Sequence, residues 1–271
     1  MLDTQYDIVG HNLMNEDGFS VKKRIITERR VYPHTHTFYE LTLYRNYKGI
    51  ITLNGVEFKI DGSFAVLLPP SDNHSMLIEN DESESIQILF TKIFMAKSAD
   101  KYLPRTTLYF TDPLKRPILI ELFEEVNKVG KANHYSGCLI AAIVQYFRTY
   151  GKTVIKNISI KSHEIVVSAM NFINENFTDE IYLTTVAKHL NVSPQYLSSV
   201  FVDECKINFV DYLSEIRLRY AAEQLKNTKL SVTEICYTSG YRNISNFMRS
   251  FKRTFGMTPR AYRISAQTNN N

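Results

Sequence analysis

Residues 231–263 read SVTEICYTSGYRNISNFMRSFKRTFGMTPRAYR, and this stretch decides the fold of the C-terminal part of the chain. Ser231 and Glu234 have the spacing of a capping box, in which two side chains satisfy two unpaired backbone N–H groups, so a helix is expected to begin here. Gly240 favours the left-handed backbone that ends such a helix. The sequence therefore predicts a short helix followed by a tight turn.

A second helix with one apolar side and one polar, basic side follows the turn. Phe247, Phe251 and Phe255 recur every four residues, and we interpret this stripe as core rather than as a surface that stacks on bases. Thr258 and Pro259 predict the N-cap and the first residue of a last helix. Two short helices joined by a glycine turn are typical of a DNA-reading module. The side chains that we expect to contact DNA here are Arg242, Asn243, Ser245, Met248, Arg249, Lys252 and Arg253.

Positive charge is concentrated in this part of the chain. From Lys229 onward there are seven Lys and Arg residues against one acid, Glu234, whereas the whole chain has a net charge of only +4. A basic helix face is usually just solvated, but such an asymmetry is typical of a module that binds a phosphate backbone. Double-stranded DNA is therefore the expected partner.

The same stretch resembles the second helix-turn-helix of the AraC/XylS family of bacterial transcription regulators. The resemblance extends back to about residue 165, and its many spaced matches make a specific signal. It is carried by Ile235, Gly240, Tyr241, Phe247, Arg249, Phe251, Lys252, Gly256, Thr258, Pro259, Tyr262 and Arg263. It implies a transcription regulator rather than an enzyme, one that binds promoter DNA, engages RNA polymerase, usually activates, and forms a homodimer.

A first copy of the module is predicted upstream. Residues 183–190 and 194–201 have the apolar spacing of two short helices, with a turn at Asn191 and a helix start at Ser193 and Pro194. The turn of the second copy is expected to be one residue longer. From the first copy we expect Gln195, Ser198 and Ser199 to contact DNA.

Residues 208–227 predict the helix that joins the two copies. Apolar residues lie on two of its sides, as a helix shared by two small cores requires, and at about 1.5 Å per residue it spans about 30 Å. Residues 161–226 contain six Lys and Arg against nine acids. We therefore expect the second copy to supply most of the affinity for DNA.

The N-terminal half has the pattern of a β-domain. The length of 271 residues favours two domains, and residues 19–90 read as short strands. Asn54–Gly55 is the strongest hairpin signal, and Asp61–Gly62 predicts the next turn. The spacing favours a small antiparallel barrel or a double-sheet jelly roll, and we expect a cupin-like barrel.

Residues 33–40 and 62–74 resemble the two cupin motifs. The matches to the metal ligands of cupin enzymes are His34, His36, Glu40 and His74. Alternate strand residues project to one face, so an H-x-H pair can chelate one ion. Barrels of AraC-type regulators keep similar histidines without being metalloenzymes, so we expect no metal, no cofactor and no catalytic residue.

The same residues are instead expected to line a small-molecule site. The expected effector-binding residues are His34, His36, Tyr39, Glu40 and His74, and the resemblance implies a sugar as the effector. The alternative is a metal-binding cupin enzyme or metal sensor fused to a DNA-binding domain.

These patterns together predict an α+β chain of two domains. The expected parts are an effector-sensing domain at residues 1–150, which includes a helix pair for dimerisation at about 114–150, a linker at 151–162, and a double helix-turn-helix domain at 163–271. The opening MLDTQYD lacks the features of a signal peptide, and no apolar run reaches the roughly 20 residues of a membrane span. A cytoplasmic protein without membrane contact is expected, and its three separated cysteines suit reduced thiols.

Overall fold

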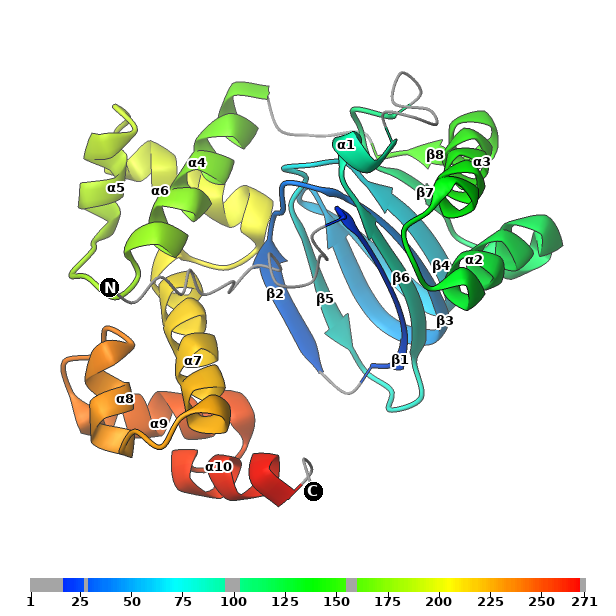
Figure 1. The fold of residues 1–271 in the computed structure, drawn as a ribbon. Helices are drawn as coiled ribbons and strands as arrows, with labels where there is room; N and C mark the ends of the chain where they lie inside the picture. The colour runs from blue at the N-terminus through cyan, green and yellow to red at the C-terminus, as the bar shows by residue number, and fades with distance from the viewer. Residues whose placement is uncertain (1–16, 27–28, 96–102, 155–159, 269–271) are drawn as a thin grey trace. The chain divides into compact units, whose positions relative to one another are not determined.

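The computed structural model describes residues 17–26, 29–95, 103–154 and 160–268 (Figure 1). Its internal contacts divide the chain between residues 160 and 161 into two compact units, called here the sheet unit and the helical unit. The opening MLDTQYD lies outside the described residues. Among the described helices, none is long and apolar enough to cross a membrane.

The sheet unit is built from antiparallel strands followed by a helix pair. The strands are β1 (Phe19–Ile25), β2 (Arg30–His34), β3 (Tyr39–Leu53), β4 (Val56–Leu68), β5 (His74–Ile78), β6 (Glu84–Phe90), β7 (Leu108–Phe110) and β8 (Lys152–Thr153). The helices are α1 (Lys92–Met95), the short 3-10 helix η3 (Pro113–Lys115), α2 (Pro117–Val129) and α3 (His134–Tyr150). The pairing order is β1-β6-β3-β4-β7-β8, with β5 paired to both β2 and β3. The two predicted helices near residues 114–150 are thus confirmed.

A long hairpin of β3 and β4 forms the centre of the sheet. The strands turn at Asn54–Gly55, whose φ angles of 50° and 79° are those that the predicted turn requires. The predicted turn at Asp61–Gly62 is wrong, because β4 runs through both residues. The pairing register shifts between Tyr44 and Tyr47 of β3, opposite Gly62, whose φ is 133°. The hairpin therefore bulges and bends at this point without turning back.

The strands form two layers that do not close into the expected barrel. The N-terminal part of β3 pairs with β6 and its C-terminal part with β5, so the two ends of the hairpin enter different layers. The pairing path ends at β1 and β8, which do not pair with each other. Helices α2 and α3 cover one face of the layer that contains β1, β6 and the N-terminal part of β3 (Figure 1). The apolar side chains on that face are therefore buried without closure of the sheet. The prediction of a β-rich domain is confirmed, whereas its closure is not.

Alternation along β3 divides its side chains between two cores. Leu41 and Leu43 are fully buried in the core shared with α2 and α3. Tyr44 belongs to the other core, inside the curved layers, with Phe64 and Val66 of β4. Because successive strand residues point to opposite faces, Glu40 and Thr42 share the interior face with Tyr44.

The helical unit has the predicted order of two similar copies around a central helix. It contains α4 (Ile160–Asn176), α5 (Leu183–His189), α6 (Pro194–Cys205), α7 (Phe209–Asn227), α8 (Val232–Thr238), α9 (Ile244–Phe255) and α10 (Pro259–Thr268). Tyr212 and Ile216 of α7 belong to the core of α4, α5 and α6. Leu218 and Leu225 of the same helix belong to the core of α8 and α9. The prediction that α7 serves two cores is confirmed.

The predicted linker at residues 151–162 is partly regular structure. Strand β8 pairs with β7, and α4 begins at Ile160, while residues 155–159 lie outside the described residues. The boundaries 1–150, 151–162 and 163–271 stay a prediction, as does the role of α2 and α3 in dimerisation.

Candidate nucleic-acid interface and interior cluster

Helix α8 begins and ends as its sequence predicts. The N–H of Ser231 donates to Glu234 Oε2 at 2.7 Å, and the N–H of Glu234 donates to Ser231 Oγ at 3.2 Å. Gly240 follows the helix with a φ of 82°, and the N–H of Tyr241 donates to the carbonyl of Cys236 at 3.1 Å. These bonds fix the turn that leads into α9.

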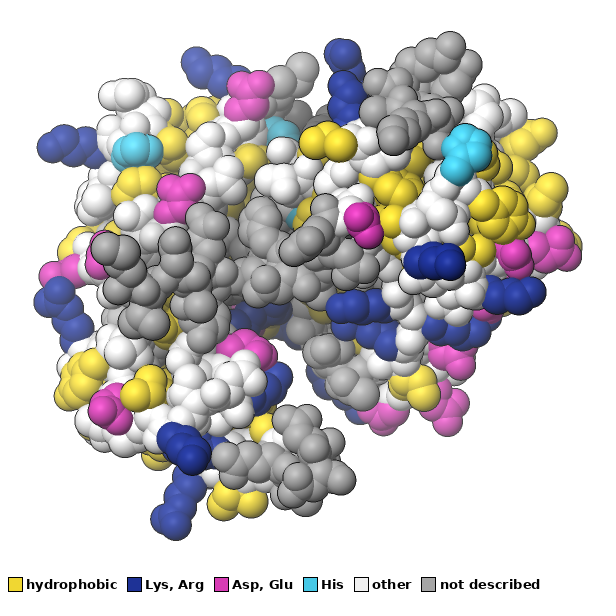
Figure 2. Space-filling model, in the orientation of Figure 1, with side chains coloured by type: hydrophobic (Ala, Val, Ile, Leu, Met, Phe, Trp, Pro, Cys, Tyr) yellow, Lys and Arg dark blue, Asp and Glu magenta, His cyan; other side chains and the backbone are white. Residues whose placement is uncertain are grey.

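Helix α9 has one exposed side with cationic residues and one buried side with aromatic residues. The Asn243 side chain caps the helix by accepting from the N–H of Asn246 at 2.9 Å. Phe247 and Phe251 are fully buried in the core of the second copy. The exposed residues Ser245, Arg249 and Lys252 follow one another at i, i+4 and i+7, so they share one face of the helix. Exposed Lys and Arg side chains stand out in the region of α8 to α10 (Figure 2).

The residues expected to contact DNA differ in exposure. Those that are exposed are Gln195, Ser199, Arg242, Asn243, Ser245, Arg249, Lys252 and Arg253. Ser198 and Met248 are half-buried, and Met248 packs against the core of the second copy. The surface available to a duplex therefore consists mainly of cations and short polar side chains.

The first copy repeats the turn geometry of the second. The N–H of Val192 donates to the carbonyl of Ala187 at 3.0 Å, which matches the bond between Tyr241 and Cys236. Residues 190–193 separate α5 from α6 and residues 239–243 separate α8 from α9, so the second turn is one residue longer, as predicted. Ser193 caps α6 through the N–H of Tyr196 at 3.2 Å.

The acidic character of the first copy is weaker at its surface than its composition indicates. Glu204 is buried and pairs with His163 of α4. Glu215 is also buried and accepts from Arg219 Nε at 2.9 Å. Two of the acids that enter the sequence count thus face the interior, and a count of residues has no means to reveal this.

A set of contacts joins the two copies beside the turn of the second. Arg217 of α7 donates from Nε to the carbonyl of Phe177 at 2.7 Å and from Nη2 to the carbonyl of Asp179 at 2.8 Å. Arg242 pairs with Glu180, with Nη2 and Oε2 2.6 Å apart. The loop between α4 and α5 is therefore held against α7 and the second turn, by pairings without a local sequence signal.

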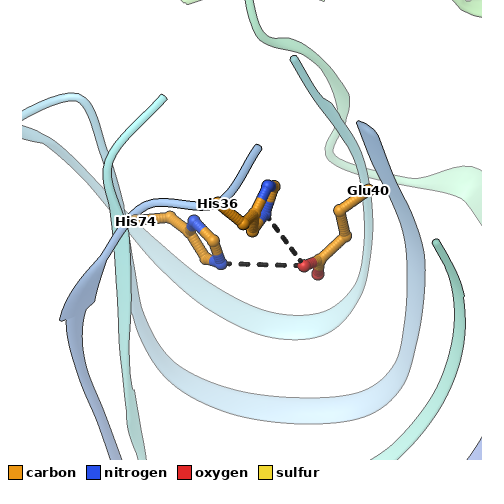
Figure 3. A group of neighbouring side chains, drawn as sticks. All are labelled: His36, Glu40 and His74. Carbon is orange, nitrogen blue, oxygen red and sulfur yellow. Dashed lines mark ion pairs between the residues drawn. The ribbon is translucent and has the colours of Figure 1, made fainter. Parts of the chain in front are cut away.

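A second constellation lies inside the sheet unit. His36 lies in the segment before β3, Glu40 in β3, and His74 at the start of β5; all three are buried. Their side chains point toward one another within the curve of the strands (Figure 3). Glu40 Oε2 is 3.4 Å from His36 Nε2 and 3.8 Å from His74 Nε2. Glu40 Oε1 accepts from Thr42 Oγ1 at 2.7 Å.

Burial and mutual interaction set the charge states of this cluster. Burial raises the pKa of the Glu40 carboxyl, but its interactions with His36 and His74 outweigh burial and hold the pKa well below its usual range. Burial lowers the pKa of His74 to about 4. At neutral pH a carboxylate therefore faces a neutral His74 ring.

The structure places the other two expected effector residues differently. His34 ends β2, its Nδ1 hydrogen-bonds to the carbonyl of Tyr32 at 2.9 Å, and its ring centroid is 4.1 Å from that of His74. His36 lies beyond the end of β2, and its ring centroid is 6.3 Å from that of His34 and 5.2 Å from that of His74. Tyr39 stacks on Phe90 in the core that faces the helices, with ring centroids 5.3 Å apart. The structure thus unites His36, Glu40 and His74, and Tyr39 lies on the opposite face of the sheet.

The comparisons with known proteins fall mainly on the helical unit. Residues 186–265 match a family model described as a helix-turn-helix domain. The HTH-type transcriptional regulator YtdP of Bacillus subtilis (strain 168) is 38% identical over 94 residues, which cover 35% of this chain and 12% of that protein. The regulator YfiF of the same strain is 27% identical over 153 residues, or 55% of this chain and 48% of that protein.

A further relative and one solved structure extend the comparison. The melibiose operon regulatory protein of Escherichia coli (strain K12) is 28% identical over 113 residues, or 41% of this chain and 37% of that protein. The chain thus spans less than half the length of the curated relatives it matches. A structure of ToxT from Vibrio cholerae, bound to an unsaturated fatty acid, has a TM-score of 0.51 at 17% identity and covers 90% of this chain and 94% of that one. This likeness concerns the fold of nearly the whole chain. The relatives carry the names of transcription regulators rather than of enzymes.

Proposed function

Because the chain belongs to the AraC/XylS family of transcription regulators, we propose that it binds promoter DNA through α9 and α6 under the control of a small molecule held in the sheet unit. The observation that carries the proposal is the face of α9. Ser245, Arg249 and Lys252 lie exposed on one side of a helix whose other side is anchored by buried phenylalanines. A rigid helix with short polar and cationic side chains is suited to the major groove.

The two copies contribute unequally in this proposal. The outer residues of α6 include Gln195 and Ser199, and Asp203 is exposed near its end, whereas α9 exposes three cations. Cations neutralise phosphates and release counterions, so α9 supplies most of the affinity and α6 adds weaker contacts.

The remaining roles are part of the same proposal. The regulator acts in the cytoplasm as a homodimer and activates transcription by engaging RNA polymerase. The exposed apolar residues Ile118 and Tyr135 on the helix pair support a role for α2 and α3 in dimerisation. The relative named for the melibiose operon supports a sugar as the effector class.

A titration of DNA binding tests the unequal roles of the two copies. A duplex is first selected from a random pool with the full chain, and its affinity is then measured by gel shift at fixed salt. Arg249→Ala is expected to weaken binding by about 1–3 kcal/mol if the side chain reads a base, or to reduce the salt slope by about 1 if it contacts a phosphate. Ser199→Ala is expected to change the affinity less.

A matched control separates this role from general charge. Arg260 is also exposed, but it lies on α10, outside the proposed interface. Arg260→Ala should leave the affinity and its salt dependence nearly unchanged. An effect of Ser199→Ala as large as that of Arg249→Ala would contradict the ranking, and the absence of any selected sequence would contradict the proposed function.

A further inference from the structure

The two helix-turn-helix copies touch each other at a place outside their cores. Among the described residues, no side chain belongs to both cores, and α7 is the element that serves each of them. A second connection, called here the joint, lies between residues 177–180, which follow α4, and residues 240–242, which precede α9. A Cβ atom at Gly240 would lie 2.6 Å from the carbonyl oxygen of Phe177 and 3.0 Å from Thr178 Cα. The two segments are therefore in direct backbone contact, which a glycine permits.

Arg217 of α7 lies at the centre of the joint. Its Nε donates to the carbonyl of Phe177 at 2.7 Å, and its Nη2 donates to the carbonyl of Asp179 at 2.8 Å. Both distances fall in the range of about 2.7–2.9 Å that is typical of charge-assisted hydrogen bonds. The same Nε would lie 2.8 Å from a Cβ atom at Gly240, so the guanidinium also lies against the turn of the second copy. One planar side chain of α7 therefore contacts a segment of each copy.

Two further contacts with α7 hold these segments beside Arg217. Tyr241 Oη is 2.8 Å from Ser214 Oγ, one turn before Arg217, and this hydrogen bond holds the second turn against α7. Tyr220, one turn after Arg217, packs on Phe177 with ring centroids 5.2 Å apart. Residues three apart on a helix are neighbours on its surface, so these three positions of α7 follow one another along one side. The two copies thus meet over a single stretch of α7, with Arg217 between them.

The geometry distinguishes Arg217 from the other cation of the joint. Arg242 pairs with Glu180 across the joint, but both side chains are exposed, and solvent screens such a pair. Arg217 is half-buried, and its rigid fork of donors binds two carbonyls at fixed angles. We propose that Arg217 is a positioning residue that fixes the orientation of α6 relative to α9 and thereby determines which spacing of two DNA half-elements the chain accepts. The inference rests on the proposed function, because it requires that both helices read DNA.

The spacing of the half-elements is a sensitive measure of this orientation. Groups that bind a partner must be held within about 0.5 Å and about 10–20° of their productive geometry. One base pair inserted between two half-elements moves them apart by about 3.4 Å and rotates them by about 34° relative to each other. Two helices that are held in one orientation cannot follow this change, so one copy loses its base contacts. Loss of the contacts to one base pair weakens binding by about 5- to 150-fold.

Gel shifts with the full chain measure the effect. A duplex selected from a random pool, and the same duplex with one base pair inserted between its half-elements, are titrated at fixed salt. The ratio of the two dissociation constants should be about 5 to 150 for the wild type. Arg217→Met removes both donors and Arg217→Lys keeps the charge without the planar fork, so each should lower this ratio at least about threefold. A variant that is merely less stable weakens binding to both duplexes equally, because the folded fraction cancels in the ratio.

Arg219→Met is the matched control, because Arg219 lies on the same helix and its Nε donates to Glu215 of α7 at 2.9 Å. This variant should keep the wild-type ratio. The inference is overturned if the wild-type ratio is close to 1, if both Arg217 variants keep that ratio, if Arg219→Met lowers it as much, or if the selected duplex contains a single element. If Arg217→Met does not fold, Arg217→Lys decides. Each of these results leaves the proposed function standing, whereas the absence of any selected sequence refutes both.

Discussion

Gly240 lies where the two helix-turn-helix copies meet, and its replacement tests how tightly they are joined. A Cβ atom at this position would lie 2.6 Å from the carbonyl oxygen of Phe177 and 2.8 Å from Arg217 Nε. These two atoms also form the hydrogen bond that holds the α4–α5 loop to α7. Gly240→Ala therefore adds crowding at the joint to the strain of a φ of 82°. Gly256 is the matched control, because its φ is 72° and no atom lies within 4 Å of a Cβ built there.

The expected losses of stability follow from two contributions, the strain of a positive φ and the crowding at the joint. Left-handed backbone costs about 1–2 kcal/mol for a residue with a Cβ atom, and this is the whole expected effect of Gly256→Ala. Gly240→Ala also displaces the Arg217 guanidinium, and loss of a hydrogen bond to a charged group costs about 1.5–3 kcal/mol. We expect a total destabilisation of about 2.5–5 kcal/mol for Gly240→Ala.

Thermal unfolding of residues 161–271, followed by far-UV circular dichroism, measures both effects. The wild-type segment must first unfold in one cooperative transition for the comparison to be valid. Each kcal/mol is expected to lower the midpoint by about 4–8 °C in a unit of this size. Equal shifts for the two variants would refute the conclusion that the joint is tightly packed.

Two further substitutions test the DNA-facing surface. Glu180→Gln removes the exposed partner of Arg242, so the free energy of unfolding should change by less than about 1 kcal/mol. The affinity for DNA should stay equal or rise. A weaker gel shift would show instead that the ion pair positions the arginine for binding. Asn243→Ala removes the N-cap of α9, and Asn208→Ala removes the N-cap of α7, so each should lower the free energy of unfolding by about 1 kcal/mol. Only Asn243→Ala should also weaken DNA binding. Equal affinities of the two variants would contradict the proposed role of Asn243.

Features that depend on neighbouring residues followed directly from the sequence. The capping box at Ser231 and the Asn54–Gly55 hairpin each arise from a few adjacent side chains with defined backbone needs. The Asp61–Gly62 turn failed because the same glycine freedom also serves a bend inside a strand, and the partner strand decides between the two. A local sequence pattern thus identifies where a strand is interrupted, but it does not distinguish a turn from a bend within the strand.

Pairings between distant segments were beyond the sequence. Glu204 entered the sequence analysis only as one of nine acids in residues 161–226, yet α4 brings His163 to it across 41 positions of the chain. The interior cluster was predicted in part, because three of its four expected histidine and glutamate residues do converge. His34 was included because it matches the first cupin motif, but it is not among the three residues whose donor atoms converge. Closure of the sheet was beyond the sequence for a similar reason, because it depends on whether the two ends of the strand order, β1 and β8, pair with each other, and they do not.

Helix α7 has a consequence for how the helical unit comes apart. Because its first half completes one core and its second half completes the other, neither copy retains a full interior when the chain is cut within or before this helix. A fragment that ends at Lys206 would expose Leu197 and Phe201, which α7 covers in the intact unit. Destabilisation that begins at one copy therefore spreads to the other through a shared element. Under the proposed function, residues remote from DNA then govern the occupancy of a promoter by setting the fraction of molecules in which both copies are folded.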